Sequence, residues 1–110
     1  MAGKFEVFRD KAGEHRFRLK AGNGEVILTS EGYSERSGCA NGIESVRRNS
    51  TDAGRFEKIR TDSGMYRFNL KAANHQIIGT SQSYASESGR DNGIVSVGRN
   101  APEAEVVEAN

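Results

Sequence analysis

The chain has 110 residues, with 16 basic and 15 acidic side chains and a formal net charge of +1. This near balance argues against a strong binder of polyanions. The single cysteine, Cys39, excludes an intramolecular disulfide and any metal site built from several cysteines. The sequence contains no long apolar run and no apolar leader. We therefore expect a cytoplasmic protein without membrane association, metal or cofactor.

A repeat organises the chain. Residues 41–49, Asn-Gly-Ile-Glu-Ser-Val-Arg-Arg-Asn, return 51 positions later as Asn-Gly-Ile-Val-Ser-Val-Gly-Arg-Asn. Aligning residues 3–50 with 54–101 gives 24 identities in 48 positions without a gap. A unit of this length is marginal alone, because a small chain buries a small share of its surface. We therefore predict a single domain over 1–110, in which repeat one (3–50) and repeat two (54–101) share one core.

Each repeat begins with three segments typical of β-strands. They span residues 5–9, 15–20 and 25–30, and then 56–60, 66–71 and 76–81. In the second segment of each repeat, apolar residues alternate with mostly basic ones, which places the two sets on opposite faces of a sheet. Gly13 and Gly64 close the first loops and can take positive φ. Asn23-Gly24 predicts a two-residue turn with both residues left-handed, a role that suits Asn74-His75 less well.

A helix is predicted to follow the strands of each repeat. The first helix would run from a Ser34 cap to about Arg48, and the second would begin at a Ser86 cap. The Asn-Gly pair in each could break the helix. Its recurrence in both repeats favours a continuous helix with a smooth surface for close packing. The acidic tail, 102–110, is expected to be disordered.

Three motifs occur in both repeats. They are Arg-Phe-x-Leu-Lys-Ala at 16–21 and 67–72, Thr-Ser-x-x-Tyr at 29–33 and 80–84, and Asn-Gly-Ile-x-Ser-Val at 41–46 and 92–97. Over residues 3–101 the chain therefore resembles the YegP-like family of uncharacterised bacterial proteins. The resemblance implies two β3α units in one sheet, with the helices exchanged between the halves, and it implies no activity. Arg90-Asp91 in place of Cys39-Ala40, and Gly98 in place of Arg47, depart from the repeat.

The leading candidate for a binding surface is the basic face of the second strands. Its residues are Arg16, Arg18, Lys20, Arg67 and Lys71. Such a row could contact phosphates of a nucleic acid or a ligand. The alternation places Phe17, Phe68 and Tyr66 on the opposite face, so the basic face lacks aromatic rings for base stacking. The competing interpretation is a solvated face whose bases pair with Glu6, Glu25 or Glu57 on neighbouring segments.

Four polar residues that repeat are candidates for a pocket: Tyr33, Asn41, Tyr84 and Asn92. The competing interpretation is structural, with each tyrosine ring packed under the following helix and each asparagine a buried amide. Catalytic residues are scarce, because His15 and His75 are not at equivalent positions and a duplicated active site would repeat its base. Cys39 is expected to be a small buried group.

These observations predict an α+β fold of two tandem β3α repeats. They would form one antiparallel six-stranded sheet with two helices on one face, in a monomer with internal pseudo-two-fold symmetry. The predicted function is that of a small non-enzymatic binding or accessory module with an unidentified partner. Inside that class, a protein-interaction module would use the open sheet face or an edge strand. The alternative is a weak binder of nucleic acid or a phosphate ligand through the basic strand face.

Overall fold

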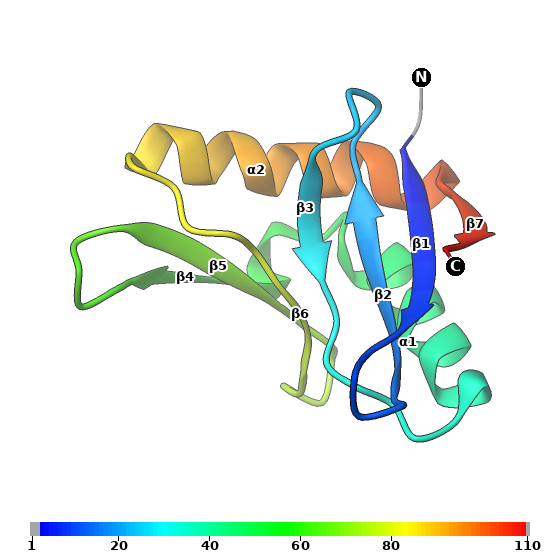
Figure 1. Cartoon of the computed structure of the whole chain (residues 1–110). Helices are drawn as coiled ribbons and strands as arrows, with labels where there is room; N and C mark the ends of the chain where they lie inside the picture. Colours follow the sequence, from blue (N-terminus) through cyan, green and yellow to red (C-terminus); the bar gives the residue numbers. More distant parts are fainter. Residues whose placement is uncertain (1–2, 110) are drawn as a thin grey trace.

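The structure is a computed structural model that describes residues 3–109. Its elements follow the predicted order of three strands and one helix, twice (Figure 1). Repeat one contains β1 Lys4–Arg9, β2 His15–Lys20, β3 Val26–Thr29 and α1 Arg36–Asn49. Repeat two contains β4 Phe56–Arg60, β5 Tyr66–Lys71, β6 Ile77–Thr80 and α2 Glu87–Asn100. Short 3-10 helices, Ala53–Arg55 and Ala101–Glu103, follow α1 and α2, and the last strand is β7, Glu105–Glu108.

The strands form one seven-stranded mixed sheet in the order β4-β5-β6-β3-β2-β1-β7. All neighbours are antiparallel except β1 and β7, which are parallel. The prediction of six antiparallel strands therefore missed the seventh strand, β7, and its parallel pairing with β1. The repeats meet where Thr29 of β3 pairs with Thr80 of β6. These residues are equivalent in the alignment, so the pseudo-two-fold axis passes between them.

The tail is part of the fold. It was expected to be disordered over 102–110, but residues 105–108 pair with β1 and the Ala109 amide donates to the Val7 carbonyl at 2.8 Å. Ala104 is almost completely buried. This strand forms because the edge of β1 is free to pair with it. Its own sequence, Glu-Val-Val-Glu, contains only a short apolar run and so gives a weak strand signal.

The hairpin loops have positive φ at Gly13, Gly24 and Gly64, and the fourth loop has it at His75. Gly13 and Gly64 have φ of 83° and 84°, as predicted. In the second loops only the last residue is left-handed: Gly24 at 87° and His75 at 70°. The Gly24 amide donates to the Ala21 carbonyl and the Ala21 amide donates to the Glu25 carbonyl, so residues 22–24 form a three-residue loop with a glycine bulge instead of the predicted two-residue turn.

Both helices continue through their Asn-Gly pairs, as predicted. Ser86 caps α2, because its hydroxyl accepts the Gly89 amide at 3.0 Å. The Ser34 cap was wrong: α1 begins after Glu35, which makes no side-chain cap bond. Among residues 3–109, no helix is both long and apolar enough to cross a membrane.

One hydrophobic core combines both repeats. Its largest fully buried side chains come from β1, β2, β3, β5, α1 and α2. Helix α1 contacts β2 of its own repeat and also β5 and β6, while α2 contacts β5 of its own repeat and also β3. In Figure 1 both helices lie behind strands β1–β3. Each helix therefore spans both repeats, which differs from the simple exchange of helices that was expected.

Candidate binding surfaces

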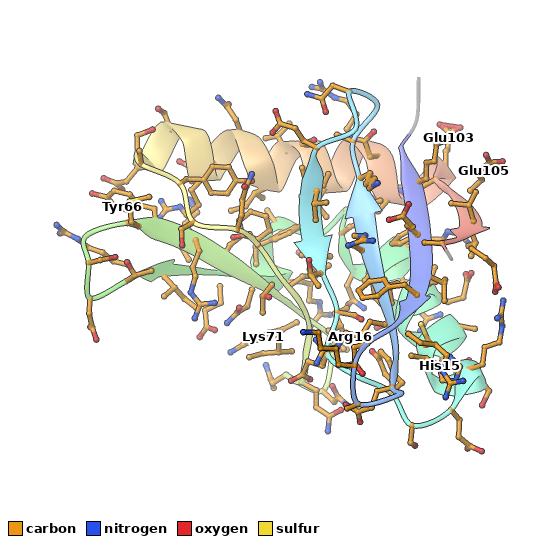
Figure 2. The ribbon with its side chains drawn as sticks, in the orientation of Figure 1. His15, Arg16, Tyr66, Lys71, Glu103 and Glu105 are labelled. Carbon is orange, nitrogen blue, oxygen red and sulfur yellow. The ribbon has the colours of Figure 1, made fainter. Side chains whose placement is uncertain are left out.

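The five predicted basic residues lie half-buried along β2 and β5, where they alternate with core residues. Arg16 and Lys71 are labelled in Figure 2. The core partners between them, such as Phe17 and Phe68, are fully buried. The alternation of strand side chains therefore holds the basic set on the outer face of the sheet, away from the helices. We call this surface the polar sheet face.

In repeat one, carboxylates neutralise the polar sheet face. The Arg18 guanidinium donates to Glu6 at 2.5 Å, and Lys20 lies 3.3 Å from the other oxygen of Glu6. Arg16 pairs with Asp10 at 2.6 Å and also donates to the Ser30 carbonyl. The cross-strand pairing with Glu6 was one of the two interpretations from the sequence, whereas Asp10 was not foreseen.

In repeat two, Glu57 has the same role as Glu6. It accepts hydrogen bonds from Asn69 and Lys71, both at 3.1 Å. Asn69 stands where repeat one has Arg18, and its side-chain oxygen is buried without a hydrogen-bond partner among the described residues. No ion pair of Arg67 is found within residues 3–109. Among the described residues, the Glu25 side chain hydrogen-bonds only inside its own loop, with Asn23.

These contacts shift the acidic groups toward their charged forms. The hydrogen bond from Arg18 is the main cause that lowers the pKa of Glu6, and the bond from Arg16 lowers the pKa of Asp10. The pKa of Glu57 is lowered by Asn69 first and by Lys71 second. The polar sheet face thus carries interleaved positive and negative charges at neutral pH, and four of its five bases are paired.

The rings of both candidate tyrosines pack against core phenylalanines, as the competing interpretation stated for the rings. Tyr33 stacks on Phe17 with 6.4 Å between ring centroids, and Tyr84 stacks on Phe68 at the same distance. A Cβ on Gly42 or Gly93 would collide with the tyrosine hydroxyl below it. The recurring helix glycines therefore let each helix approach its tyrosine. Burial raises the pKa of Tyr33.

Asn41 and Asn92 are exposed on the helices, so the expectation of buried amides was wrong. Asn92 and Tyr84 do line a common cleft of about 180 Å³, together with Asn23 and Glu25 from the loop of repeat one. That cleft includes neither Tyr33 nor Asn41.

The catalytic inventory is small. Cys39 is buried as predicted, and burial raises the pKa of its thiol, which disfavours the nucleophilic thiolate. His75 lies in an exposed turn, whereas His15 forms a backbone bridge with Tyr33. Within residues 3–109, no group of three or more His, Cys, Asp or Glu side chains could hold a metal.

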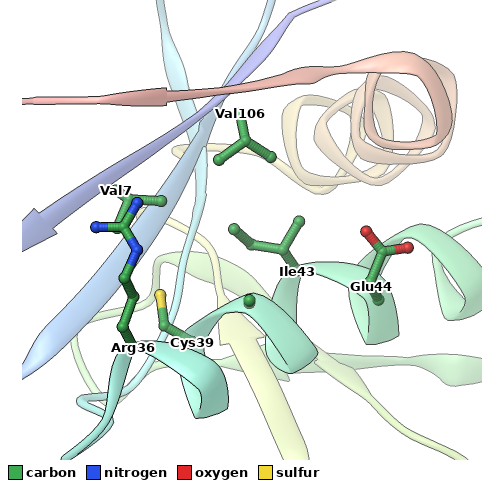
Figure 3. Close-up of a pocket in the computed structure, with 7 residues that line it drawn as sticks. Val7, Arg36, Cys39, Ile43, Glu44 and Val106 are labelled. Atoms are coloured by element: carbon green, nitrogen blue, oxygen red, sulfur yellow. The ribbon is translucent and has the colours of Figure 1, made fainter.

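A groove between β1 and α1 is filled by the chain's own last strand. Val106 of β7 points toward Cys39 and Ile43 of α1 and leaves a hollow of only about 100 Å³ (Figure 3). Arg47 of α1 donates to the Ala104 carbonyl at 2.6 Å, and its guanidinium lies 5.5 Å from the Phe5 ring centroid. At the other end of β7, Glu108 forms an ion pair with Arg36.

The equivalent groove in repeat two is open at the end near Phe56, whereas at its other end Lys58, Arg90 and Asp91 stand where the first groove has Val7, Cys39 and Ala40. We call it the β4–α2 groove; it is lined by Ser50, Thr51, Ala53, Phe56, Ile94, Val95 and Gly98, and its volume is about 320 Å³. At the offset of 51 residues, Phe56, Ile94, Val95 and Gly98 correspond to Phe5, Ile43, Glu44 and Arg47 of repeat one, and Ser50, Thr51 and Ala53 correspond to Ala101, Pro102 and Ala104. Gly98 stands in place of Arg47, so no side chain fills the hollow. A Cβ on Gly98 would lie 2.9 Å from the Ser50 carbonyl oxygen, which explains the glycine.

The outer edge of β4 is also uncovered. Strand β4 is at the end of the sheet, and the counterpart of β7 in the alignment, residues 54–57, is used to enter β4 itself. Lys58 replaces the buried Val7 and pairs with Asp91 at 3.3 Å. Val95 replaces Glu44 and is 55% exposed, the most exposed large hydrophobic among the described residues. This groove was not predicted from the sequence, although the replacement of Arg47 by Gly98 was a signal of it.

The fold and its repeat define the class of protein: two tandem β-β-β-α units with one shared core. The family described as a domain of unknown function, DUF1508, matches residues 10–57 and again 62–108. The chain belongs to this family, and the resemblance found in the sequence is confirmed.

The relatives are similar over nearly their whole length. A protein of Stutzerimonas stutzeri, named "UPF0339 protein in ptx operon 5'region", is 59% identical over 98% of this chain and 97% of its own. The UPF0339 protein YegP of Escherichia coli K12 is 53% identical over 91% of both chains. These names give no activity.

Solved structures show the same fold. The solution NMR structure of YegP from E. coli, described as a protein of unknown function, has a TM-score of 0.94 at 49% identity, covering 100% of this chain and 97% of that one. A UPF0339 protein from Shewanella oneidensis has a TM-score of 0.92 at 51% identity, covering 98% and 92%.

Proposed function

We propose that the protein is a small, non-enzymatic binding module that recognises a protein partner through the β4–α2 groove. One contrast carries the proposal. Phe5 is fully buried beneath the chain's own tail and Arg47, whereas its equivalent, Phe56, remains partly exposed in an open hollow. An apolar hollow beside an unpaired strand edge is a surface that protein partners use.

The alternative from the sequence, a binder of nucleic acid or a phosphate ligand through the polar sheet face, has less support. Its affinity would depend on unpaired bases that release counterions. Glu6, Asp10 and Glu57 already occupy four of the five bases. We therefore assign the binding role to the groove, in a cytoplasmic protein that acts as a monomer.

The test is affinity capture from a nuclease-treated bacterial lysate with three immobilised proteins: the wild type, Val95→Glu and Asn41→Glu. Val95→Glu puts a charge into the groove, and Asn41→Glu adds the same charge to an exposed position of α1. We expect a discrete partner on the wild type and on Asn41→Glu, and its loss from Val95→Glu. The same proteins on all three, or no specific protein on any, would contradict the proposal.

A further inference from the structure

We propose that the β4–α2 groove takes an extended segment of a partner protein, apolar and acidic in composition, which pairs in parallel with β4 as β7 pairs with β1. This inference rests on the proposed function and specifies its ligand. The structure contains the template for such a complex, because one of two equivalent grooves is already occupied by an extended segment, Glu-Val-Val-Glu-Ala at 105–109.

The backbone of β4 is oriented for this pairing. In repeat one the Val7 carbonyl accepts the Ala109 amide, so the polar groups of Val7 face outward, away from β2. Lys58 is the equivalent residue and has the same place in the antiparallel pairing: Val7 opposes Phe17, and Lys58 opposes Phe68. Because successive residues of a strand alternate, the backbone groups of Phe56, Lys58 and Arg60 all face the open edge.

The composition of the partner follows from the side chains around the edge. Strand β4 carries Lys58 and Arg60 and is preceded by Arg55. Lys58 pairs with Asp91 at 3.3 Å, Arg55 pairs with Asp52 at 3.4 Å and Lys71 pairs with Glu57, so Arg60 is the base without an ion pair here among the described residues. In the template, Glu105 is the register partner of Lys4, whose equivalent is Arg55. The template's Val106 lines a common hollow with Ile43, whose equivalent is Ile94 beside the exposed Val95. An acidic residue followed by a branched apolar residue therefore suits the start of the partner segment.

A second copy of this chain is a poor occupant of the same edge. Two-fold pairing of β4 with itself must keep residues of the same face opposite each other. The three central registers then place Lys58 opposite Lys58, Glu57 opposite Glu57, or Lys58 opposite Arg60. Like charges directly opposite one another destabilise a pair of strands. Lysine on an edge strand is itself a common protection against such self-association.

The test is an amide-resolved NMR titration of the labelled full chain with a capped peptide, Glu-Val-Val-Glu-Ala. The peptide starts at the equivalent of residue 105, because Ala53 already occupies the place that Ala104 has in repeat one. We expect shifts at residues 55–60 and 94–98. The amide signals of residues 4–7 should not shift, because β7 already covers this edge. Since β7 belongs to the same chain, its effective concentration is high and the peptide does not displace it. Val95→Glu should weaken binding about tenfold and Asn41→Glu should not.

Two modified peptides test the strand pairing itself. N-methylation of the final alanine removes the amide that would donate to the Lys58 carbonyl, as Ala109 donates to Val7, and should abolish the shifts. N-methylation of the preceding glutamate, whose amide faces away from β4 by alternation, should leave them. A lysine-substituted peptide, Lys-Val-Val-Lys-Ala, should bind more weakly than the acidic one.

Several outcomes would overturn the inference. They are the absence of shifts at β4 with about 1 mM peptide, equal binding of the two methylated peptides, or shifts that depend on protein concentration without peptide, which would indicate a second copy. A failure of this inference is separable from a failure of the proposed function. If Val95→Glu loses a partner from the lysate while the peptide leaves β4 unshifted, the binding module remains and strand pairing is excluded.

Discussion

Phe5 and Phe56 are equivalent residues of the two repeats, yet Phe5 is fully buried and Phe56 is partly exposed. The difference comes from the segments that follow the helices. After α2 the chain runs along the outer edge of β1, and Arg47 of α1 donates a hydrogen bond to this segment at the Ala104 carbonyl. After α1 the chain instead enters β4, and the outer edge of β4 stays free. A duplicated sequence has thus produced one self-filled groove and one open groove.

Arg47→Ala should lower the free energy of unfolding by about 1–3 kcal/mol, because Arg47 links α1 to the Ala104 carbonyl and covers Phe5. Its buried Nε atom has no partner among the described residues, which offsets part of this contribution. Arg48→Ala, at the neighbouring exposed position, should change stability by less than about 0.5 kcal/mol. Urea denaturation of both variants measures the difference, and equal losses would show that Arg47 does not hold the tail.

Gly42→Ala should destabilise the protein by about 1–3 kcal/mol, because the new Cβ would overlap the Tyr33 hydroxyl. Tyr33→Phe alone should be nearly neutral, since no hydrogen bond of that hydroxyl is found within residues 3–109. The double variant should lose less than Gly42→Ala, because the closest colliding atom is gone. A denaturation cycle over the four proteins gives the coupling, and purely additive losses would rule out the overlap as the reason for the glycine.

The sequence predicted elements well where local pattern and repeat agreed. Strand positions came from alternation, and the two helices from the recurring Ile-x-x-Val spacing, which the Asn-Gly pairs did not interrupt. Strand β7 was missed because its existence depends on the free edge of β1, which is far away in the sequence, and the acidic tail alone suggested disorder. Ser34 looked like a cap, but α1 begins one residue later than such a cap requires.

The candidate site was less predictable than the fold. Alternation placed the five basic residues correctly on one face, and Glu6 and Glu57 were foreseen as partners. The groove depends instead on differences between the repeats: Gly98 for Arg47 and Val95 for Glu44. A substitution at one position does not reveal what covers it. Only the packing shows that Arg47 fills a hollow that Gly98 leaves open.

Stability should fall with acidification below about pH 4.5, and Glu6 should account for part of the fall. The pKa of Glu6 in the folded protein lies below its ordinary value of 4.5, chiefly through the Arg18 hydrogen bond. The folded state therefore binds fewer protons than the unfolded state in this range. The stabilisation is complete above pH 4.5 and is lost as the pH falls through the folded pKa.

Glu6→Gln should consequently be less stable than the wild type at pH 7 and should lose stability less steeply below pH 4.5. Urea denaturation at several pH values between about 2 and 7 measures both effects. Glu25→Gln is the matched control, because Glu25 is exposed and, among the described residues, its side chain hydrogen-bonds only with Asn23 in its own loop. Parallel pH curves for the wild type and Glu6→Gln would exclude the Arg18 pairing as a source of acid sensitivity.

Short DNA and RNA oligomers should leave the amides of residues 16–20 and 67–71 unshifted, even at low salt, because the polar sheet face is internally neutralised. Glu6→Gln with Glu57→Gln removes the carboxylates that hold Arg18, Lys20 and Lys71. This double variant should acquire weak binding that fades as salt rises, since freed bases attract phosphates and release counterions. Wild-type shifts that disappear on charge reversal, Arg16→Glu with Arg67→Glu, would instead establish the polar sheet face as a nucleic-acid surface.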